Sequence, residues 1–147
     1  MIVVDTSVFL DGLFKFDQRR NDKARILFRL IEEKDILIVE PEIFRVELIG
    51  QLVRRMNKDE ATVLYESIVE MLEFIKTKDL RRIAFSIAYE TGSRAIDAFF
   101  IATAKIEVSH LISNDKTQVE SARKSGVKAY YLLEEFENVT EMIKSRA

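Results

Sequence analysis

The chain of 147 residues has no cysteine, one histidine and one proline. The absence of cysteine excludes a disulfide framework and any metal site built from thiolates. Because His110 is the only imidazole, zinc held by histidines and a Ser-His-Asp triad are poor interpretations. Chemistry in this protein is therefore expected to depend on carboxylates and hydroxyls.

Long apolar runs are also missing. A membrane-spanning helix needs about 20 apolar residues, and no window of that length lacks a charge. The first apolar run, residues 2–4, is too short for the apolar region of a secretory signal. We therefore expect a soluble, cytoplasmic protein that does not associate with a membrane.

The sequence also lacks a strong excess of charge of one sign. Charged residues make up 33% of the chain, but the net charge is only -2, whereas bulk nucleic-acid binders are usually basic. Contacts with nucleic acid would then require local basic patches or a bound metal. With 48% hydrophobic residues and no linker or repeat, residues 1–147 are expected to form a single domain with a core of normal size.

What the chain does contain is an alternation of short apolar runs and longer segments with helical spacing. Strands that alternate with helices indicate a parallel sheet covered on both faces, so we predict a three-layer α/β/α sandwich with four to five strands. Pro41 suits the first turn of a helix, and Gly92 and Gly126 suit helix ends. The predicted strands are residues 2–4, 36–39, 111–113 and 129–132, and the predicted helices are residues 21–34, 41–57, 59–76, 79–91, 94–107, 116–125 and 134–144.

Two carboxylates follow predicted strands closely. Asp5 comes directly after the run at residues 2–4, and Asp115 comes shortly after the run at residues 111–113. Ligands of such sheets bind beyond the carboxyl ends of the strands, so both side chains are candidates for a site. The alternative for each is a helix cap, because Asp is a common N-cap residue.

A third candidate, Asp97, lies in a segment that is apolar nearly all round. Between residues 95 and 104 the only other polar residue is Thr103, which predicts a buried helix. Phe100 and Ile101, one turn further on, cannot pair with a carboxylate, so its burial is costly unless something compensates. The helix dipole would contribute about 0.3–1 kcal/mol, and a metal ion would compensate more strongly. A capping or dipole role is the alternative.

Glu47 cannot be separated from Glu40 and Glu42 by composition. On a helical wheel its side also holds Ile43 and Arg54, so that face is mixed. Periodicity alone leaves all three glutamates as possible site residues. A half-exposed surface position is the simplest interpretation of Glu47.

Four short segments, taken in order, resemble the PIN-domain nucleases and, among them, the VapC-type toxins. They are VVDTSVF at the amino terminus, RVELIGQLVRR after the second predicted strand, AIDAFFIATA in the buried helix and HLISNDKT at a strand end. The resemblance covers nearly the whole chain and implies a PIN-like fold. Residues 59–91 match nothing specific, and their role is open.

The resemblance also implies which residues form the site. The acidic positions of the family map to Asp5, Glu47, Asp97 and Asp115, as catalytic residues and as ligands of Mg²⁺ or Mn²⁺. The hydroxyl positions that would orient them map to Thr6, Ser7 and Ser113, the last being often threonine in the family. Physical chemistry agrees, because converging carboxylates repel one another and both ions prefer carboxylate oxygens.

The implied function is a metal-dependent ribonuclease that cleaves RNA by attack of water on phosphorus, as the toxin of a toxin–antitoxin pair with an antitoxin protein as partner. The alternatives are an RNA-processing or decay nuclease without an antitoxin, and a PIN domain without catalysis that acts as a binding module. A phosphotransfer enzyme with an aspartate nucleophile would usually have a second Asp at the position of Ser7. A homodimer is also expected, because the family commonly pairs and Phe14, Phe16, Phe44 and Phe74 offer more aromatic surface than a small core needs.

Overall fold

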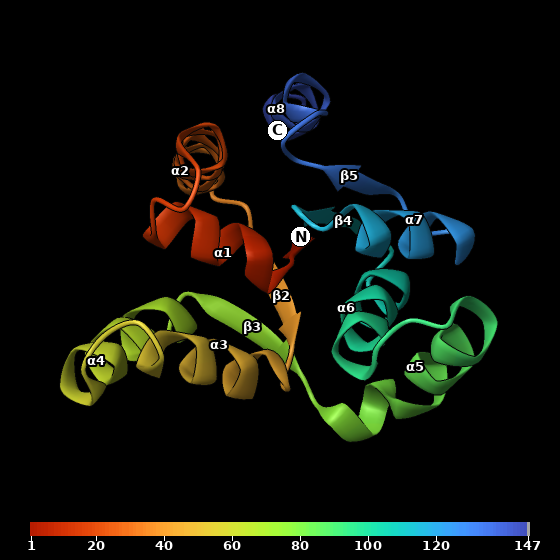
Figure 1. Ribbon diagram of the computed structural model, residues 1–147. Coiled ribbons are helices and arrows are strands. Elements are labelled where there is room, and N and C mark those ends of the chain that lie inside the picture. The colour runs from red at the N-terminus through yellow and green to blue at the C-terminus, as the bar shows by residue number, and fades with distance from the viewer. Residues whose placement is uncertain (147) are drawn as a thin grey trace.

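The computed structural model describes residues 1–146 and folds them around one five-stranded sheet with helices on both faces (Figure 1). The strand order is β3-β2-β1-β4-β5, and all pairs of neighbouring strands are parallel. This arrangement confirms the predicted α/β/α sandwich. In chain order the elements are β1 (Ile2–Val4), α1 (Thr6–Leu13), α2 (Gln18–Glu33), β2 (Ile38–Pro41), α3 (Phe44–Val53), α4 (Lys58–Val69), β3 (Leu72–Ile75), α5 (Thr77–Thr91), α6 (Ala95–Ile106), β4 (His110–Ser113), α7 (Lys116–Lys124), β5 (Ala129–Tyr131) and α8 (Phe136–Lys144).

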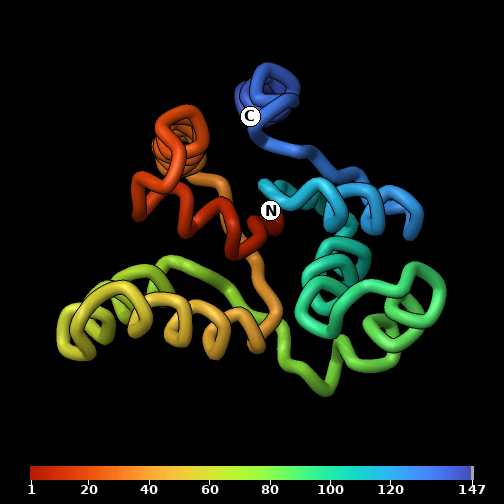
Figure 2. Tube along the Cα trace, viewed as in Figure 1, coloured from red at the N-terminus to blue at the C-terminus, as the bar shows by residue number. Residues whose placement is uncertain are grey.

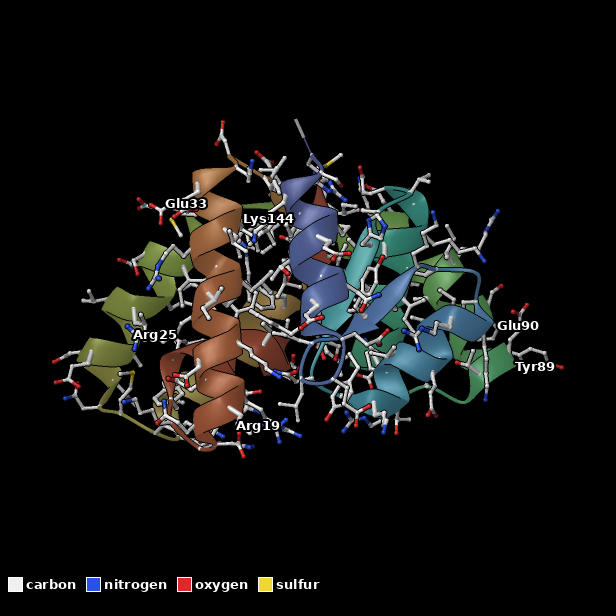
Figure 3. The ribbon with its side chains drawn as sticks, turned by 90° about the horizontal axis from the view of Figure 1, so that it is seen from above. Arg19, Arg25, Glu33, Tyr89, Glu90 and Lys144 are labelled. Atoms are coloured by element: carbon white, nitrogen blue, oxygen red, sulfur yellow. The ribbon has the colours of Figure 1, made fainter. Side chains whose placement is uncertain are left out.

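The direction in which the chain adds strands reverses at the centre of the sheet. From β1 the chain adds β2 and β3 on one side, and it then crosses to add β4 and β5 on the other side. Helices α1 to α4 cover one face and α5 to α7 the opposite face, as the right-handed crossover rule requires, and α8 returns to lie beside α2 (Figures 1 and 3). The reversal lies between β1 and β4, and folds of this kind bind ligands at the carboxyl ends of such strands.

The core lies on both faces of the central strands. All three residues of β1 are fully buried, as expected for a parallel strand with helices on each side. Helix α6 packs across the middle of one face, where Phe100 and Ile101 are fully buried. The prediction of a buried helix around Asp97 is therefore confirmed.

Strand β3 was not predicted, because residues 59–76 were expected to form one helix. In the structure α4 ends at Val69 and β3 begins at Leu72. The apolar residues Leu64, Ile68 and Leu72 keep helical spacing across this boundary, so periodicity gave no sign of the change. The strand forms because residues 72–75 pair with residues 38–41 of β2, which is a contact between distant parts of the sequence.

The prediction that Pro41 begins a helix was wrong. Pro41 is the last residue of β2, and α3 begins only at Phe44. Proline is rare inside a central strand because it cannot donate a backbone hydrogen bond.

Helix α1 was also absent from the predicted elements. The predicted helix ends at Gly92 and Gly126 are confirmed, and each of these glycines has a positive φ that suits glycine.

The aromatic residues expected to form a dimer surface have mixed positions. Phe44 is fully buried and contacts the rings of Phe9 and Phe100, with centroid distances of 5.1 and 6.2 Å, so it belongs to the core. Phe14 and Phe74 are half-buried against the same core. Phe44 therefore offers no surface to a partner, whereas Phe16 is 59% exposed.

The last described residue, Arg146, contacts the first, Met1, and the course of the chain between them is traced in Figure 2. The Nη1 of Arg146 donates a hydrogen bond of 3.0 Å to the carbonyl oxygen of Met1. Helices α2 and α8 lie side by side (Figure 3). Lys23 of α2 donates a 2.7 Å hydrogen bond to the carbonyl of Leu133, shortly before α8, which helps to hold the two helices together. None of the helices formed by residues 1–146 has both the length and the apolar character that crossing a bilayer demands.

Candidate active site

Asp5 leaves the carboxyl end of β1 at the centre of the sheet. It stands at the N-cap position of α1, but its carboxylate makes no capping hydrogen bond. Instead, its Oδ2 accepts a hydrogen bond of 2.6 Å from the Ser113 hydroxyl and one of 3.1 Å from the Ser7 hydroxyl. The capping alternative therefore does not describe Asp5, and two of the predicted hydroxyl residues contact its carboxylate.

Asp5 is only 6% exposed, so the ionised form of its carboxyl is unfavourable. Burial raises its pKa from 3.8 to about 7, and the negative charges of Asp97 and Glu47 act in the same direction. The hydrogen bonds from Ser113 and Ser7 oppose this rise because they stabilise the carboxylate. Asp5 is therefore a buried acid close to two others.

Glu47 extends from the first turn of α3 and is half-buried. Burial raises its pKa, and the charge of Asp97 raises it further, whereas the nearby Thr6 hydroxyl lowers it. That hydroxyl is buried and forms no hydrogen bond of ordinary geometry. The three glutamates that the sequence left equivalent are thus distinct, because Glu42 is exposed and Glu40 is fully buried within β2.

Asp97 has a basic partner that the sequence argument missed. The Nε of Arg94 lies 3.0 Å from Asp97 Oδ2, and Arg94 is the N-cap residue of the same helix, α6. The expectation that only a metal ion would compensate this carboxylate strongly was therefore incomplete, because Arg94, three residues before Asp97, lies on the same helix face. Burial still raises the pKa of Asp97, despite the opposing effect of Arg94, so the carboxylate is not fully compensated.

Asp115 serves as a cap and also faces the other acids. Its Oδ1 accepts hydrogen bonds from the backbone N–H groups of Thr117 at 3.0 Å and Gln118 at 3.4 Å, at the start of α7. Its Oδ2 lies 3.8 Å from Arg94 Nη2. The capping alternative is therefore correct for one oxygen of Asp115, and the other oxygen points to the same guanidinium as Asp97.

Three polar residues that sequence reasoning missed connect this region. The backbone N–H of Asn114 donates to the Ser7 hydroxyl at 3.0 Å, and the Asn114 side chain donates to Asp11 Oδ2 at 2.7 Å. Gln118 Nε2 donates to the carbonyl of Asp97 at 3.2 Å. Asp11 lies one turn after Ser7 on α1, and that spacing was the available signal.

The acidic residues fit a hard divalent cation in their chemistry. Asp97 and Glu47 raise the pKa of Asp5, and Asp115 raises that of Asp97, so Asp97 links the other acids electrostatically. Their donor atoms are carboxylate oxygens, which Mg²⁺ and Mn²⁺ prefer. In residues 1–146, however, no three Asp, Glu or His side chains are arranged so that they could hold an ion, and Arg94 supplies the positive charge.

Comparisons with known proteins agree with this architecture. The structure of FitAB bound to an IR36 DNA fragment is similar with a TM-score of 0.66 and 22% identity, covering 88% of this chain and 94% of that chain. The crystal structure of FitAcB from Neisseria gonorrhoeae gives a TM-score of 0.61 and 21% identity, with coverage of 88% and 96%. At these identities the likeness concerns the fold alone.

Sequence comparisons give the family. A search of curated protein sequences finds no significant match to this chain. A family model described as PIN domain matches residues 2–124, which include all four candidate acids. The chain therefore belongs to the PIN domain family.

Proposed function

We propose that residues 1–147 form a single PIN-like domain that acts as an endoribonuclease dependent on Mg²⁺ or Mn²⁺. The observation that carries this proposal is that Asp5, Glu47 and Asp97 come from three separate parts of the chain, and that Asp97 is close enough to raise the pKa of both Asp5 and Glu47. They lie at the carboxyl edge of the sheet, beside the reversal of strand order. PIN domains are generally metal-dependent nucleases.

In this proposal Asp5, Glu47, Asp97 and Asp115 would hold the ion after their side chains rearrange from the positions described above. When bound, the ion would lower the pKa of a water molecule and stabilise negative charge on the scissile phosphate. Ser113 and Ser7 fix the orientation of the Asp5 carboxylate through their hydrogen bonds. Ser113 also accepts a 2.9 Å hydrogen bond from the backbone N–H of Asp115, so one hydroxyl links two of the acids. Such links preserve the positions of metal ligands.

Basic side chains near the acids support a phosphodiester substrate. The Arg94 side chain is 75% exposed and lies beside Asp97 and Asp115, so a phosphate that approaches the site meets a guanidinium. Lys76 and Lys78 are exposed and follow β3 directly, at the same edge of the parallel sheet. Contacts of this kind add affinity without sequence preference.

One observation favours a second candidate function, a PIN domain that binds RNA or protein without catalysis. Arg94 already pairs with Asp97 and approaches Asp115, so a cation from the protein itself compensates part of the acidic charge. In that case the acids would be a structural ion-pair network. Metal binding separates the two candidates, because only the nuclease requires it.

We further propose that the protein is the toxin of a toxin–antitoxin pair, as the four sequence segments suggest. A pocket of about 570 Å³ lies between α1, α2, α4 and the neighbouring strands and is lined largely by apolar side chains, including Phe9, Leu13, Phe28 and Met71. Met71 is 72% exposed. An apolar segment of an antitoxin would cover this surface, as helices of partners do in apolar grooves.

A homodimer is proposed as well, on a different surface from the one first expected. Phe85 and Tyr89 lie one turn apart on α5 and are 74% and 85% exposed. Tyr89 points away from the body of the protein (Figure 3). Exposed aromatic side chains in one patch are typical of protein interfaces.

The decisive experiment is RNA cleavage by protein stripped of metal. Cleavage is expected with added Mg²⁺ or Mn²⁺ and is expected to stop with EDTA, because in this proposal the ion activates the attacking water and stabilises charge on the phosphate. Asp97→Asn is the inactive control, and the exposed Glu42→Gln is the matched active control. Activity that survives complete chelation would refute the carboxylate site. Absence of both cleavage and Mn²⁺ binding would favour the binding module.

A further inference from the structure

Glu40 is a fully buried carboxyl in the interior of the sheet that the proposed reaction does not use. Its Oε1 accepts a hydrogen bond of 2.9 Å from the backbone N–H of Val4, on the neighbouring strand β1. Its Oε2 has no hydrogen-bond partner among residues 1–146. Burial raises its pKa well above the ordinary value, so the neutral carboxylic acid is favoured. A buried polar group of this kind is costly and calls for a specific explanation.

The hydrogen bond from Val4 replaces a backbone bond of the sheet. The N–H of Ile2 donates to the carbonyl of Leu37, so a regular parallel ladder would next join the N–H of Val4 to the carbonyl of Val39. The same ladder would require an N–H from residue 41 for the carbonyl of Val4, and Pro41 has none. The register of β1 and β2 accordingly contains only the pair Ile2 and Ile38.

The two sides of β1 are therefore held differently at its carboxyl end. Towards β4, three residue pairs are in register, and the N–H of Asp5 continues with a 2.9 Å hydrogen bond to the carbonyl of Ile112. Towards β2, the Glu40 side chain takes the place of the backbone. The charges of Asp5 and Glu47 both act on the Glu40 carboxyl, so it lies near both acids.

We propose that Glu40 is a positioning residue for the metal-binding acids. Its carboxyl stands in for a backbone carbonyl, keeps the end of β1 apart from β2 and so determines where Asp5 leaves the sheet. Pro41 contributes by removing the donor that would otherwise continue the ladder. This inference rests on the proposed function, because it assigns to Glu40 the arrangement of the acids that hold the ion.

Mn²⁺ binding to the full-length protein, followed by calorimetry or by electron paramagnetic resonance, tests the inference. Glu40→Gln keeps an oxygen acceptor for Val4 and resembles the neutral acid, so its Mn²⁺ affinity is expected to stay within about threefold of the parent. Glu40→Leu has a similar volume but no acceptor, and its affinity is expected to fall by about tenfold to a hundredfold. Val139→Ala, in the buried face of α8, is the control for lost stability alone and should keep the parent affinity.

The possible results distinguish a failure of this inference from a failure of the proposed function. Parent affinity in Glu40→Leu would overturn the positioning role while leaving the metal site intact. A loss in Glu40→Gln as large as in Glu40→Leu would also overturn it, because the acceptor is retained there; this variant decides the question if Glu40→Leu does not fold. Absence of Mn²⁺ binding by the parent itself would overturn the proposed function and this inference together.

Discussion

Replacing Asp5 by asparagine is expected to stabilise the metal-free protein above about pH 7 and to have little effect near pH 4. The Asp5 carboxyl has a pKa of about 7 in the folded protein, against an ordinary value of 3.8, because it is buried beside Asp97 and Glu47. That difference corresponds to about 4 kcal/mol of unfolding free energy, as an upper limit. Asparagine removes the charge, and its side-chain oxygen can still accept hydrogen bonds from Ser113 and Ser7.

The sign of the pH dependence follows from proton binding. Between the unfolded and the folded pKa, the folded protein holds a proton on Asp5 that the unfolded chain has lost, so the parent loses stability as the pH rises through this window. The Asp5→Asn variant lacks this group. Its advantage over the parent should therefore grow from about zero near pH 4 to at most about 4 kcal/mol near pH 8.

Urea unfolding of both proteins in EDTA, at a series of pH values, measures this difference. Asp59→Asn, at an exposed position of α4, is the matched control for the substitution itself. Added Mn²⁺ should reduce the stability difference between the two proteins at high pH, or reverse its sign. The parent binds the ion more tightly, and a ligand that binds the folded state stabilises that state. An Asp5→Asn protein that is less stable than the parent at high pH, or a difference independent of pH, would refute the argument.

Three further predictions concern the other acids and the assembly. Without metal, the unfolding free energy of Asp97→Asn should be within about 1 kcal/mol of the parent value or above it, because removing a buried charge is partly offset by loss of the ion pair with Arg94. Cleavage by this variant should fall by orders of magnitude, and retained cleavage would remove Asp97 from the site. Glu47→Gln should abolish cleavage, whereas Glu42→Gln should retain most of it, and the reverse result would show that the helix register assigned to the site is wrong. Light scattering at micromolar concentration should give the mass of a dimer, and Tyr89→Glu should give that of a monomer, since Tyr89 is exposed on α5; a monomeric parent would contradict the dimer.

Local sequence predicted the parts of the candidate site that depend on strand ends and on a buried helix. Asp5 and Asp115 were placed correctly at the carboxyl ends of strands, because a short apolar run followed by polar residues is a local signal. Asp97 was placed correctly in the first turn of a buried helix, because a segment that is apolar nearly all round is also a local signal. Glu47 needed the resemblance to a family, because its helix face is mixed and its burial depends on elements far away in the chain.

The partners of these acids were beyond local reasoning. Ser113 and Asp5 are 108 positions apart, and Asn114 and Asp11 are 103 positions apart, yet both pairs form hydrogen bonds. Such bonds exist because parallel strands bring their carboxyl ends to one edge of the sheet. Arg94 is the exception, since it lies only three residues before Asp97 and a helical spacing could have revealed the pair.

The amino-acid sequence by itself determined the fold class and the number of layers, because the hydrophobic period that sets helices and strands acts within a few residues of each position. Tertiary structure alone decided that residues 72–75 form a strand rather than the end of a helix, since their pairing with β2 outweighs a helical spacing that continues through them. It also decided that Glu40 is buried while Glu42, two residues later, is exposed. The physical reason is that the burial of a carboxyl depends on which strands and helices pack around it, and these come from distant parts of the chain.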